Sequence, residues 1–183
     1  VWKRAAIVLA GPVFNLFFAA LIFIFIFMHG LPVLFPEVGD VMKQSPARAA
    51  GLIKGDRIVE ADGVVVNQWT ELTEIIHKNP DKALTFKIKR DNKIIVVPIT
   101  PERKKIKDIF GEEKEIGLIG IKPSGSSFIQ KKGVVGAIAS GITRTWEVSV
   151  LTIVGIVKLI QRIVPADTIG GTILIFQMAG EQA

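Results

Sequence analysis

Three residues of little use in a plain membrane anchor, Gly11, Pro12 and Asn15, lie inside an apolar run from Ala5 to Met28. A helix of about 24 residues, at about 1.5 Å per residue, is long enough to cross a hydrocarbon core of roughly 30 Å. Pro12 leaves a backbone carbonyl without its helical donor, and lipid cannot satisfy the amide of Asn15. Such groups are tolerated where protein or a water-filled cavity supplies partners, so we expect this span to pack against something functional. The alternative is a kinked anchor with a buried structural asparagine.

Residues suited to metal or disulfide chemistry are scarce. The chain has no cysteine, which excludes disulfides and thiolate metal sites. His29 and His77 are far apart in the sequence, and neither has a carboxylate or a second histidine at ligand spacing. We therefore interpret both histidines as surface or capping residues rather than metal ligands.

The net charge of the 183 residues is +6, but the basic residues are scattered along the chain. Arg103–Lys105 forms a basic cluster, and acidic residues follow it closely. Because no basic face is interleaved with aromatic residues, we expect no nucleic-acid binding. The charge instead favours a solvated surface with some attraction for anionic lipid. The length allows one compact domain of about 100 residues with membrane-associated flanks.

The residues around the first apolar run predict its orientation. Lys3 and Arg4 precede the run and His29-Gly30 follows it, which places the N-terminal end in the cytoplasm and the following residues outside. The run is too long for a typical signal peptide and lacks a small-residue cleavage site. Because Val1 is not a methionine, we expect the chain to be a piece of a longer protein.

Residues 37–123 have the short strands and turns of a small β-domain. Ser45–Leu52 combines a capping serine, a proline at the first helical position and a late glycine, which predicts a short helix. Asp62-Gly63 predicts a tight hairpin, and Asp91-Asn92 predicts a turn. Gln68–Lys78 has apolar residues at helical spacing. The predicted strands are 38–42, 57–61, 64–66, 84–89, 94–99 and 116–121, and we expect a polar loop over 101–114.

This series of motifs resembles a bacterial PDZ domain. The residues that carry the resemblance are Val41, Ser45-Pro46-Ala47, Ala50-Gly51-Leu52, Gly55-Asp56, Ile58 and Asp62-Gly63. In that family the strand order is circularly permuted and the strand beside the peptide groove comes last. The resemblance therefore implies a groove with one wall on the strand and the other on the helix over 68–78. The groove residues would be Gly117, Leu118, Ile119, Gly120, Ile121, Trp69, Leu72 and Ile76.

Such a groove would bind an extended peptide or a peptide C-terminus along the strand edge. Gly117 and Gly120 would permit a close approach of the peptide backbone. The alternative is that the two glycines only ease a twisted edge strand and that the groove is closed.

A second apolar region, residues 134–164, is interrupted by charged residues: Arg144, Glu147, Lys158 and Arg162. Its longest uncharged stretch, 148–157, covers only about half of a bilayer core, and charges at a helix centre are costly in lipid. Trp146 suits the headgroup level. We expect one or two amphipathic helices on the outer membrane surface, and the alternative is a second span. Gly170-Gly171 then breaks the chain, and residues 165–183 would begin a further membrane-associated segment.

The order of these features resembles the RseP-type branch of the site-2 protease family, which are intramembrane zinc metalloproteases. The opening from Val1 to Asn15 is similar to that family's second transmembrane segment, and the resemblance covers essentially the whole chain. The family's His-Glu-x-x-His and Asn-Pro-x-x-Asp-Gly motifs are absent from these 183 residues, and Gly171-Thr172 stands where the family has Gly-Pro. The resemblance implies zinc in the complete protein and none bound by this chain, which would be the internal part of a protease or a non-catalytic relative.

The expected fold class is membrane α plus α+β: one transmembrane helix over residues 1–30, a circularly permuted PDZ β-domain, and then amphipathic helices. The resemblance implies the substrate-handling portion of an intramembrane metalloendopeptidase in the bacterial inner membrane, with the PDZ domain outside the cytoplasm. Its partners would be the lipid bilayer and transmembrane protein substrates. Asn15 would lie beside the active site and hold an unwound substrate backbone, and Gly11 and Pro12 would shape that wall.

The resemblance also implies roles for the other two parts. The PDZ domain would act as a size filter or as a sensor of a newly exposed chain end, and the amphipathic region would guide the substrate helix. A different class of function is a membrane-tethered PDZ module that binds peptides without catalysis. A third, a soluble chaperone-protease PDZ domain with a signal anchor, would need a Ser/His/Asp set on an adjacent domain, which nothing in the sequence supports.

Overall fold

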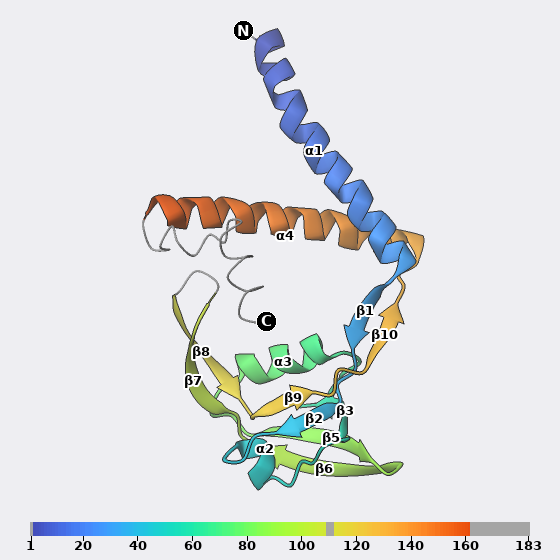
Figure 1. Ribbon diagram of the computed structural model, residues 1–183, viewed down its shortest axis with the longest axis vertical. Helices are drawn as coiled ribbons and strands as arrows, with labels where there is room; N and C mark the ends of the chain where they lie inside the picture. The colour runs from blue at the N-terminus through green and yellow to red at the C-terminus, as the bar shows by residue number, and fades with distance from the viewer. Residues whose placement is uncertain (1, 109–111, 162–183) are drawn as a thin grey trace, which may run out of the picture.

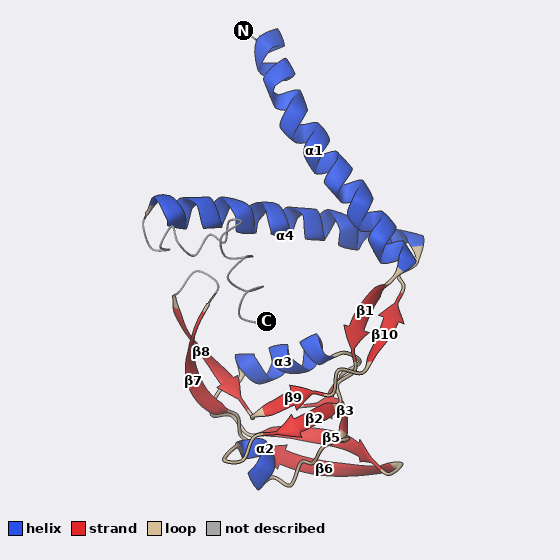
Figure 2. Cartoon of the chain, viewed as in Figure 1, coloured by secondary structure: helices blue, strands red, loops and turns tan. Residues whose placement is uncertain are grey.

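The computed structural model describes residues 2–108 and 112–161. Figure 1 shows a long N-terminal helix, a second long helix that crosses it near its C-terminal end, and a β-rich region, residues 36–123, beneath the second helix. Figure 2 shows that most strands lie in the β-rich region, whereas the others connect it to the long helices. The long apolar helices are therefore separate from the β-rich region, which has its own hydrophobic core.

The N-terminal helix, α1 (Trp2–His29), follows the first apolar run and contains Pro12 without interruption. Among the described residues, α1 alone is long and apolar enough to cross a membrane, over Ala10–His29, as judged by length and composition. The helix stops at Gly30, which has a φ of +106°. A Cβ at Gly30 would also collide with the side chain of Ile129, so the turn out of the helix requires glycine.

A two-stranded ribbon that the sequence did not predict joins the long helices to the β-rich region. It consists of β1 (Leu31–Leu34) and β10 (Ser127–Gln130), which pair antiparallel. The ring of Phe128, on β10, stacks on that of Phe35 with centroids 4.6 Å apart, and the guanidinium of Arg57 lies 4.3 Å from the centroid of Phe35. The connection is therefore a paired and packed one, which is stiffer than two single linkers.

The β-rich region has two short helices and eight strands among the described residues. These are β2 (Val38–Val41), α2 (Pro46–Ala49), β3 (Arg57–Ala61), β4 (Val64–Val65), α3 (Trp69–Lys78), β5 (Leu84–Arg90), β6 (Lys93–Ile99), β7 (Glu102–Lys107), β8 (Glu113–Leu118) and β9 (Ile121–Pro123). The sheet order is β4-β3-β5-β6, with further pairs β2–β9 and β7–β8, and every pair is antiparallel. The core between the sheet and α3 includes the fully buried side chains of Phe86, Leu52, Ile58, Leu72, Leu84, Ile88, Ile119 and Val38.

The local signals in the sequence are confirmed where they rest on capping and turn chemistry. Ser45 caps α2, and its Oγ accepts the N–H of the residue three positions on at 3.2 Å. Asp62 and Gly63 have φ values of +51° and +82°, and Asp91 and Asn92 have +47° and +61°. Positive φ at both central residues is the geometry of the tight turns that join antiparallel strands with the correct twist.

Two expectations for the end of the β-rich region were wrong. The segment expected to be a loop, 101–114, contains β7 and the start of β8, because basic residues on β7 lie opposite acidic residues on β8. Arg103 bonds Glu115 at 2.7 Å, and Lys105 lies 3.7 Å from Glu113. The single strand expected over 116–121 is divided between β8 and β9, because Gly120 has a φ of +79°, which turns the chain.

The second apolar region is one continuous helix, α4 (Val134–Ile160), over its described part. Its small residues Ala137, Gly141 and Thr145 are buried against α1, and a Cβ at Gly141 would lie 2.5 Å from Cγ1 and 2.9 Å from the backbone nitrogen of Ile24. Small side chains at a spacing of four residues let two helix backbones approach closely. The predicted break at 170–171 and the segment over 165–183 lie outside the described residues.

Candidate functional site

The three residues singled out on α1 lie on the half of the helix that no other described element covers. Gly11, Pro12 and Asn15 are all exposed, and a Cβ at Gly11 would have no neighbour within 4 Å. Within the described residues, the side chain of Asn15 makes no hydrogen bond. The adjacent Val13 and Phe14 are 59% and 70% exposed. An amide inside an apolar helical surface of this kind needs a partner if the surface lies in lipid.

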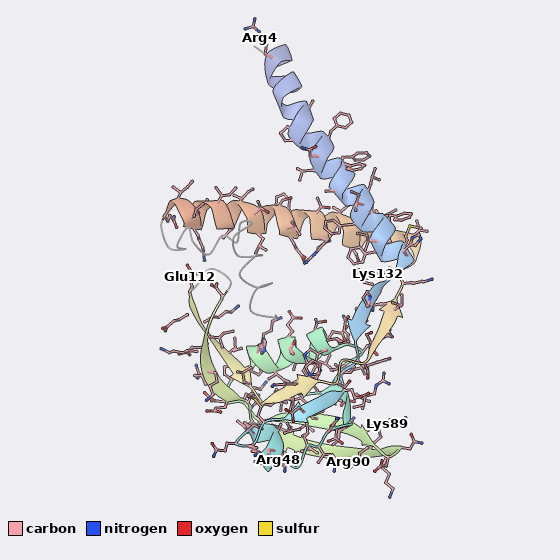
Figure 3. The ribbon with its side chains drawn as sticks, viewed as in Figure 1. Arg4, Arg48, Lys89, Arg90, Glu112 and Lys132 are labelled. Carbon is pink, nitrogen blue, oxygen red and sulfur yellow. The ribbon has the colours of Figure 1, made fainter. Side chains whose placement is uncertain are left out.

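The C-terminal half of α1 packs against α4. Ala20 and Ile24 are half-buried where α4 crosses, and the helices meet at Gly141. Figure 3 shows Arg4 at the free end of α1 and Lys132 at the end where the helices cross. The ammonium group of Lys132 lies 5.1 Å from the ring centroid of Phe27 and 2.6 Å from Oγ of Ser140, so it bridges the two helices. The crossing therefore leaves the face around Asn15 open.

The helix that was expected to form one wall of a peptide groove contributes mainly to the core. Leu72 is fully buried, Ile76 is 3% exposed, and Trp69 is half-buried against the same cluster. Gly117 is buried, and a Cβ there would meet the carbonyl oxygen of Ile76. Gly117 thus permits a close approach of β8 to α3 itself. At this position the strand and the helix lie in direct contact.

The rest of the expected groove strand lies against α2. The N–H of Ala47 donates to the carbonyl of Ile119 at 2.9 Å, and the N–H of Met42 donates to that of Gly120 at 2.9 Å. Ile119 is buried in the core, and a Cβ at Gly120 would meet the side chain of Ser45. These contacts fix the position of the segment between β8 and β9.

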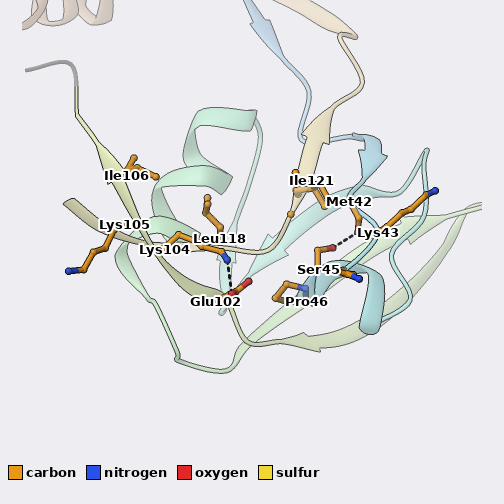
Figure 4. Close-up of a pocket in the computed structure, with 12 residues that line it drawn as sticks. Met42, Lys43, Ser45, Pro46, Glu102, Lys104, Lys105, Ile106, Leu118 and Ile121 are labelled. Atoms are coloured by element: carbon orange, nitrogen blue, oxygen red, sulfur yellow. Dashed lines mark hydrogen bonds and ion pairs between the residues drawn. The ribbon is translucent and has the colours of Figure 1, made fainter. Parts of the chain in front are cut away.

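A cavity of about 730 Å³ opens beside this segment, between β7 and the turn from β2 to α2 (Figure 4). Leu118, Gly120 and Ile121 line it, so three of the predicted groove residues share one hollow. The opposite wall is not α3. The remaining lining residues are Met42, Lys43, Gln44, Ser45, Pro46, Glu102, Lys104, Lys105 and Ile106. A hollow of this size is within the range of ligand-binding pockets.

A buried ion pair positions the α2 wall of the cavity. The carboxylate of Asp56 is fully buried and accepts two bonds from Arg90, each at 2.7 Å, and one from the N–H of Ile53 at 2.9 Å. Arg90 also donates to the carbonyl of Gly51 at 2.8 Å. The hydrogen bonds to Asp56 raise the pKa of Arg90 above its usual value. The pair therefore ties the chain after α2 to the end of β5.

The two histidines are separate in the fold, as the sequence indicated. The ring of His29 lies 4.3 Å from that of Phe25 at the end of α1. His77 is half-buried on α3, where burial lowers its pKa, and the charge of Lys114 lowers it further. Among the described residues, no group of three or more His, Cys, Asp and Glu side chains could hold a metal ion. The described part of the chain therefore does not fit a zinc site.

A family model described as peptidase family M50 matches residues 1–183. The chain belongs to peptidase family M50. This is the site-2 protease family, so the resemblance of the sequence is confirmed. The M50 chain is 31% identical over 184 residues to the regulator of sigma-W protease RasP from Bacillus subtilis. The match covers 100% of this chain and 42% of that protein. It is 32% identical over 182 residues to the zinc metalloprotease RasP from Geobacillus kaustophilus, covering 99% and 41%.

The M50 chain spans about half, or less, of the length of the curated relatives it matches. Among solved structures, it is similar to the PDZ domain of an SdrC-like protein from Listeria innocua, with 28% identity and a TM-score of 0.37. The similarity covers 50% of this chain and 92% of that one. A second PDZ domain of an SdrC-like protein, from Listeria monocytogenes, has 26% identity and a TM-score of 0.34 over 50% and 85%.

Proposed function

We propose that this chain is the substrate-handling portion of an intramembrane zinc metalloendopeptidase that cuts membrane-anchored proteins in regulated intramembrane proteolysis. The observation that carries the proposal is the exposed Asn15 amide on a helix long enough to span a bilayer, in a chain that matches family M50 throughout. Zinc metalloprotease relatives imply zinc in the complete protein. The residues described here contribute binding and orientation of the substrate.

The chemical task of Asn15 in this proposal is to hold a substrate backbone. A transmembrane helix hides its carbonyl groups in its own hydrogen bonds, so the substrate must be opened before water can attack a peptide bond. An amide offers both a donor and an acceptor, which suits an extended backbone. Pro12 removes one helical hydrogen bond from α1 and frees a carbonyl one turn earlier. Gly11 has no side chain that would cover the backbone beside it. Together they present an open face on which such a backbone can lie.

We propose that the β-rich region lies outside the cytoplasm, at the surface of the bacterial inner membrane. The exposed apolar face of α4 supports this placement, because Trp146 is 71% and Ile153 61% exposed there. The opposite face of α4 carries charges, and Lys158 on it pairs with Glu112 at 2.6 Å. Figure 3 shows Glu112 beneath the end of α4, on the side of the β-rich region. A helix with these two faces suits a position in the plane of the membrane surface.

The β-rich region would select substrates by binding an extended peptide or a chain end. Its sequence carries the PDZ motif series, and β9 pairs with β2 alone among the described strands, so its second edge has no strand partner. An open edge offers backbone donors and acceptors to an added strand. Because Gly117 on β8 already contacts α3, we expect such binding along β9 rather than between β8 and α3.

The second candidate is a membrane-tethered PDZ module that binds peptides and cuts nothing. The absence of a metal-binding group from the described residues is compatible with this role. The two candidates differ in what they require of Asn15. A tethered module needs α1 only as an anchor, whereas the proposed protease needs the Asn15 amide to hold its substrate.

The test is cleavage of a membrane-embedded model substrate by a longer gene product that contains this chain, with Asn15→Leu and Asn15→Gln. We expect Asn15→Leu to reduce the cleavage rate about tenfold, which corresponds to one hydrogen bond of about 1.4 kcal/mol. Asn15→Gln should restore part of the rate because it keeps the amide. Val13→Leu, at an exposed apolar position two residues away, serves as the control. Unchanged cleavage in Asn15→Leu would favour the tethered module.

A further inference from the structure

The cavity beside Leu118 has an apolar interior with cationic surroundings. Met42 and Ile106 are 53% and 39% exposed on its two sides, and Leu118 and Ile121 are half-buried between them. Figure 4 shows Lys43 and Lys105 pointing outward at opposite sides of the hollow. When a ligand covers exposed apolar groups in a concave surface, their removal from water favours binding.

The charge around the cavity is unbalanced. Its lining contains three lysines and one glutamate. Glu102 pairs with Lys104 at 2.7 Å, and Lys105 lies 3.7 Å from Glu113, whereas Lys43 has no ion pair within the described residues. The four residues from Lys43 to Pro46 also line an adjoining hollow of about 490 Å³. Arg48 is exposed in that second hollow and likewise has no ion pair in the described part of the chain.

The strand beside the cavity favours a polypeptide as the occupant. Within the described residues, β7 pairs with β8 alone, and its second edge has no partner strand. An unpaired edge is a template for an extended chain. Figure 1 shows α2 at the end of the β-rich region that lies away from α1 and α4, which argues against a lipid surface as the partner. A second copy of this chain, with its net charge of +6, would be repelled rather than attracted.

We propose that this cavity docks an extended, acidic polypeptide segment, with one large apolar side chain of the segment in the hollow and its carboxylates near Lys43 and Arg48. The site lies on the α2 side of the segment over 118–121 and is distinct from a groove between β9 and α3. It binds an internal segment and needs no free C-terminus. The proposal rests on the proposed function only for the source of the segment, which would be a membrane-anchored substrate.

Fluorescence anisotropy with the intact chain in lipid nanodiscs tests the docking directly. The probe is a fluorescein-labelled nine-residue peptide with one Leu between Glu residues in a Gly/Ser background, amidated at its C-terminus so that a terminal carboxylate cannot contribute. We expect it to bind at least about tenfold more tightly than the same peptide with Lys in place of Glu, and the difference to shrink as salt rises. Replacing its Leu with Ser should weaken binding by a similar factor.

Variants of the chain locate the binding. Ile106→Glu introduces a carboxylate into the cavity and should weaken binding about tenfold, and Lys43→Glu should weaken it about fivefold. Lys93→Glu makes the same charge change at an exposed position on β6. It should weaken peptide binding only by the amount that the change in net charge causes. Circular dichroism verifies that each variant folds. Because Lys43 is an exposed turn residue, Lys43→Glu keeps the proposal testable if Ile106→Glu does not fold.

Equal binding of the acidic and basic peptides, unchanged binding in both cavity variants, or no binding of the acidic peptide at millimolar concentration would overturn the proposal. Self-association of the chain that Ile106→Glu abolishes would also overturn it and would assign the surface to a second copy. The assay contains no cleavage step. A failure of the Asn15 experiment therefore leaves this result unaffected, and a failure here leaves the protease assignment unaffected.

Discussion

Replacing Arg90 with methionine is expected to destabilise the β-rich region by about 3 kcal/mol. The change keeps much of the aliphatic stem but removes three hydrogen bonds, two to the buried carboxylate of Asp56 and one to the carbonyl of Gly51. Breaking a buried ion pair by removing one partner costs about 3–5 kcal/mol, because the remaining charge has no compensation. The side chain of Arg90 is 28% exposed, so water can reach the site and the lower figure applies.

Thermal and urea unfolding of the full chain in detergent, followed by circular dichroism, measures this loss. For a region of this size, about 3 kcal/mol corresponds to a fall in Tm of about 12–24 °C. Lys89→Met removes a neighbouring exposed charge that has no ion pair among the described residues, and should change stability by less than about 0.5 kcal/mol. Asp56→Asn combined with Arg90→Met should be less destabilised than the sum of the single changes, because the buried charge is gone. A loss below about 1 kcal/mol in Arg90→Met, or additive effects, would refute the reasoning.

Three further predictions concern pH, the crossing of the long helices and the surface of α4. Because burial and Lys114 lower the pKa of His77, the unfolded chain binds more protons than the folded chain below the unfolded value of about 6.5. Tm should therefore fall as the pH drops from about 7.5 to about 5, and His77→Gln should reduce this fall; an unchanged pH profile would contradict it. Gly141→Val should separate α1 from α4 and speed proteolysis of α4 in nanodiscs, whereas Gly136→Val, where a Cβ meets only a side chain at 3.7 Å, should not. With the other two tryptophans replaced by phenylalanine, brominated lipid should quench Trp146, and fluorescence identical with and without brominated lipid would argue against an interfacial helix.

Features encoded by a few adjacent residues could be predicted from the sequence. The cap at Ser45, the turns at Asp62-Gly63 and Asp91-Asn92, and the helix α3 depend on capping, positive φ and helical spacing, which are visible in short windows. The long helix α1 was equally clear from its apolar length. These local features predict most of the succession of strands and helices from β2 to β6.

Features that depend on distant partners were missed. The strands β1 and β10 are four residues each and pair across the whole β-rich region, so neither has a pattern of its own that identifies it. The strand β7 is rich in lysine, which is depleted in strands, and it is stabilised by acidic residues on β8 that the sequence places within the same charged stretch.

The cavity contains some of the residues that the sequence suggested for a groove and not others. Leu118, Gly120 and Ile121 were named from the sequence and do share a cavity. The helical spacing of Leu72 and Ile76 showed an apolar face, but spacing cannot distinguish a face that fills the core from one that lines an open groove. The turn over 42–44, which lines the cavity across from the segment over 118–121, carries no motif that marks it as part of a site.

The central claim is that this chain handles substrates for a zinc-dependent protease of family M50. The most direct measurement compares zinc content and cleavage of a membrane-embedded model substrate for this chain and for a longer gene product that contains it. The account predicts stoichiometric zinc and chelator-sensitive cleavage in the longer protein, and neither in this chain by itself. Cleavage that chelators leave unchanged would contradict the zinc-dependent mechanism. No zinc and no cleavage in either protein would contradict the account and leave a tethered peptide-binding module.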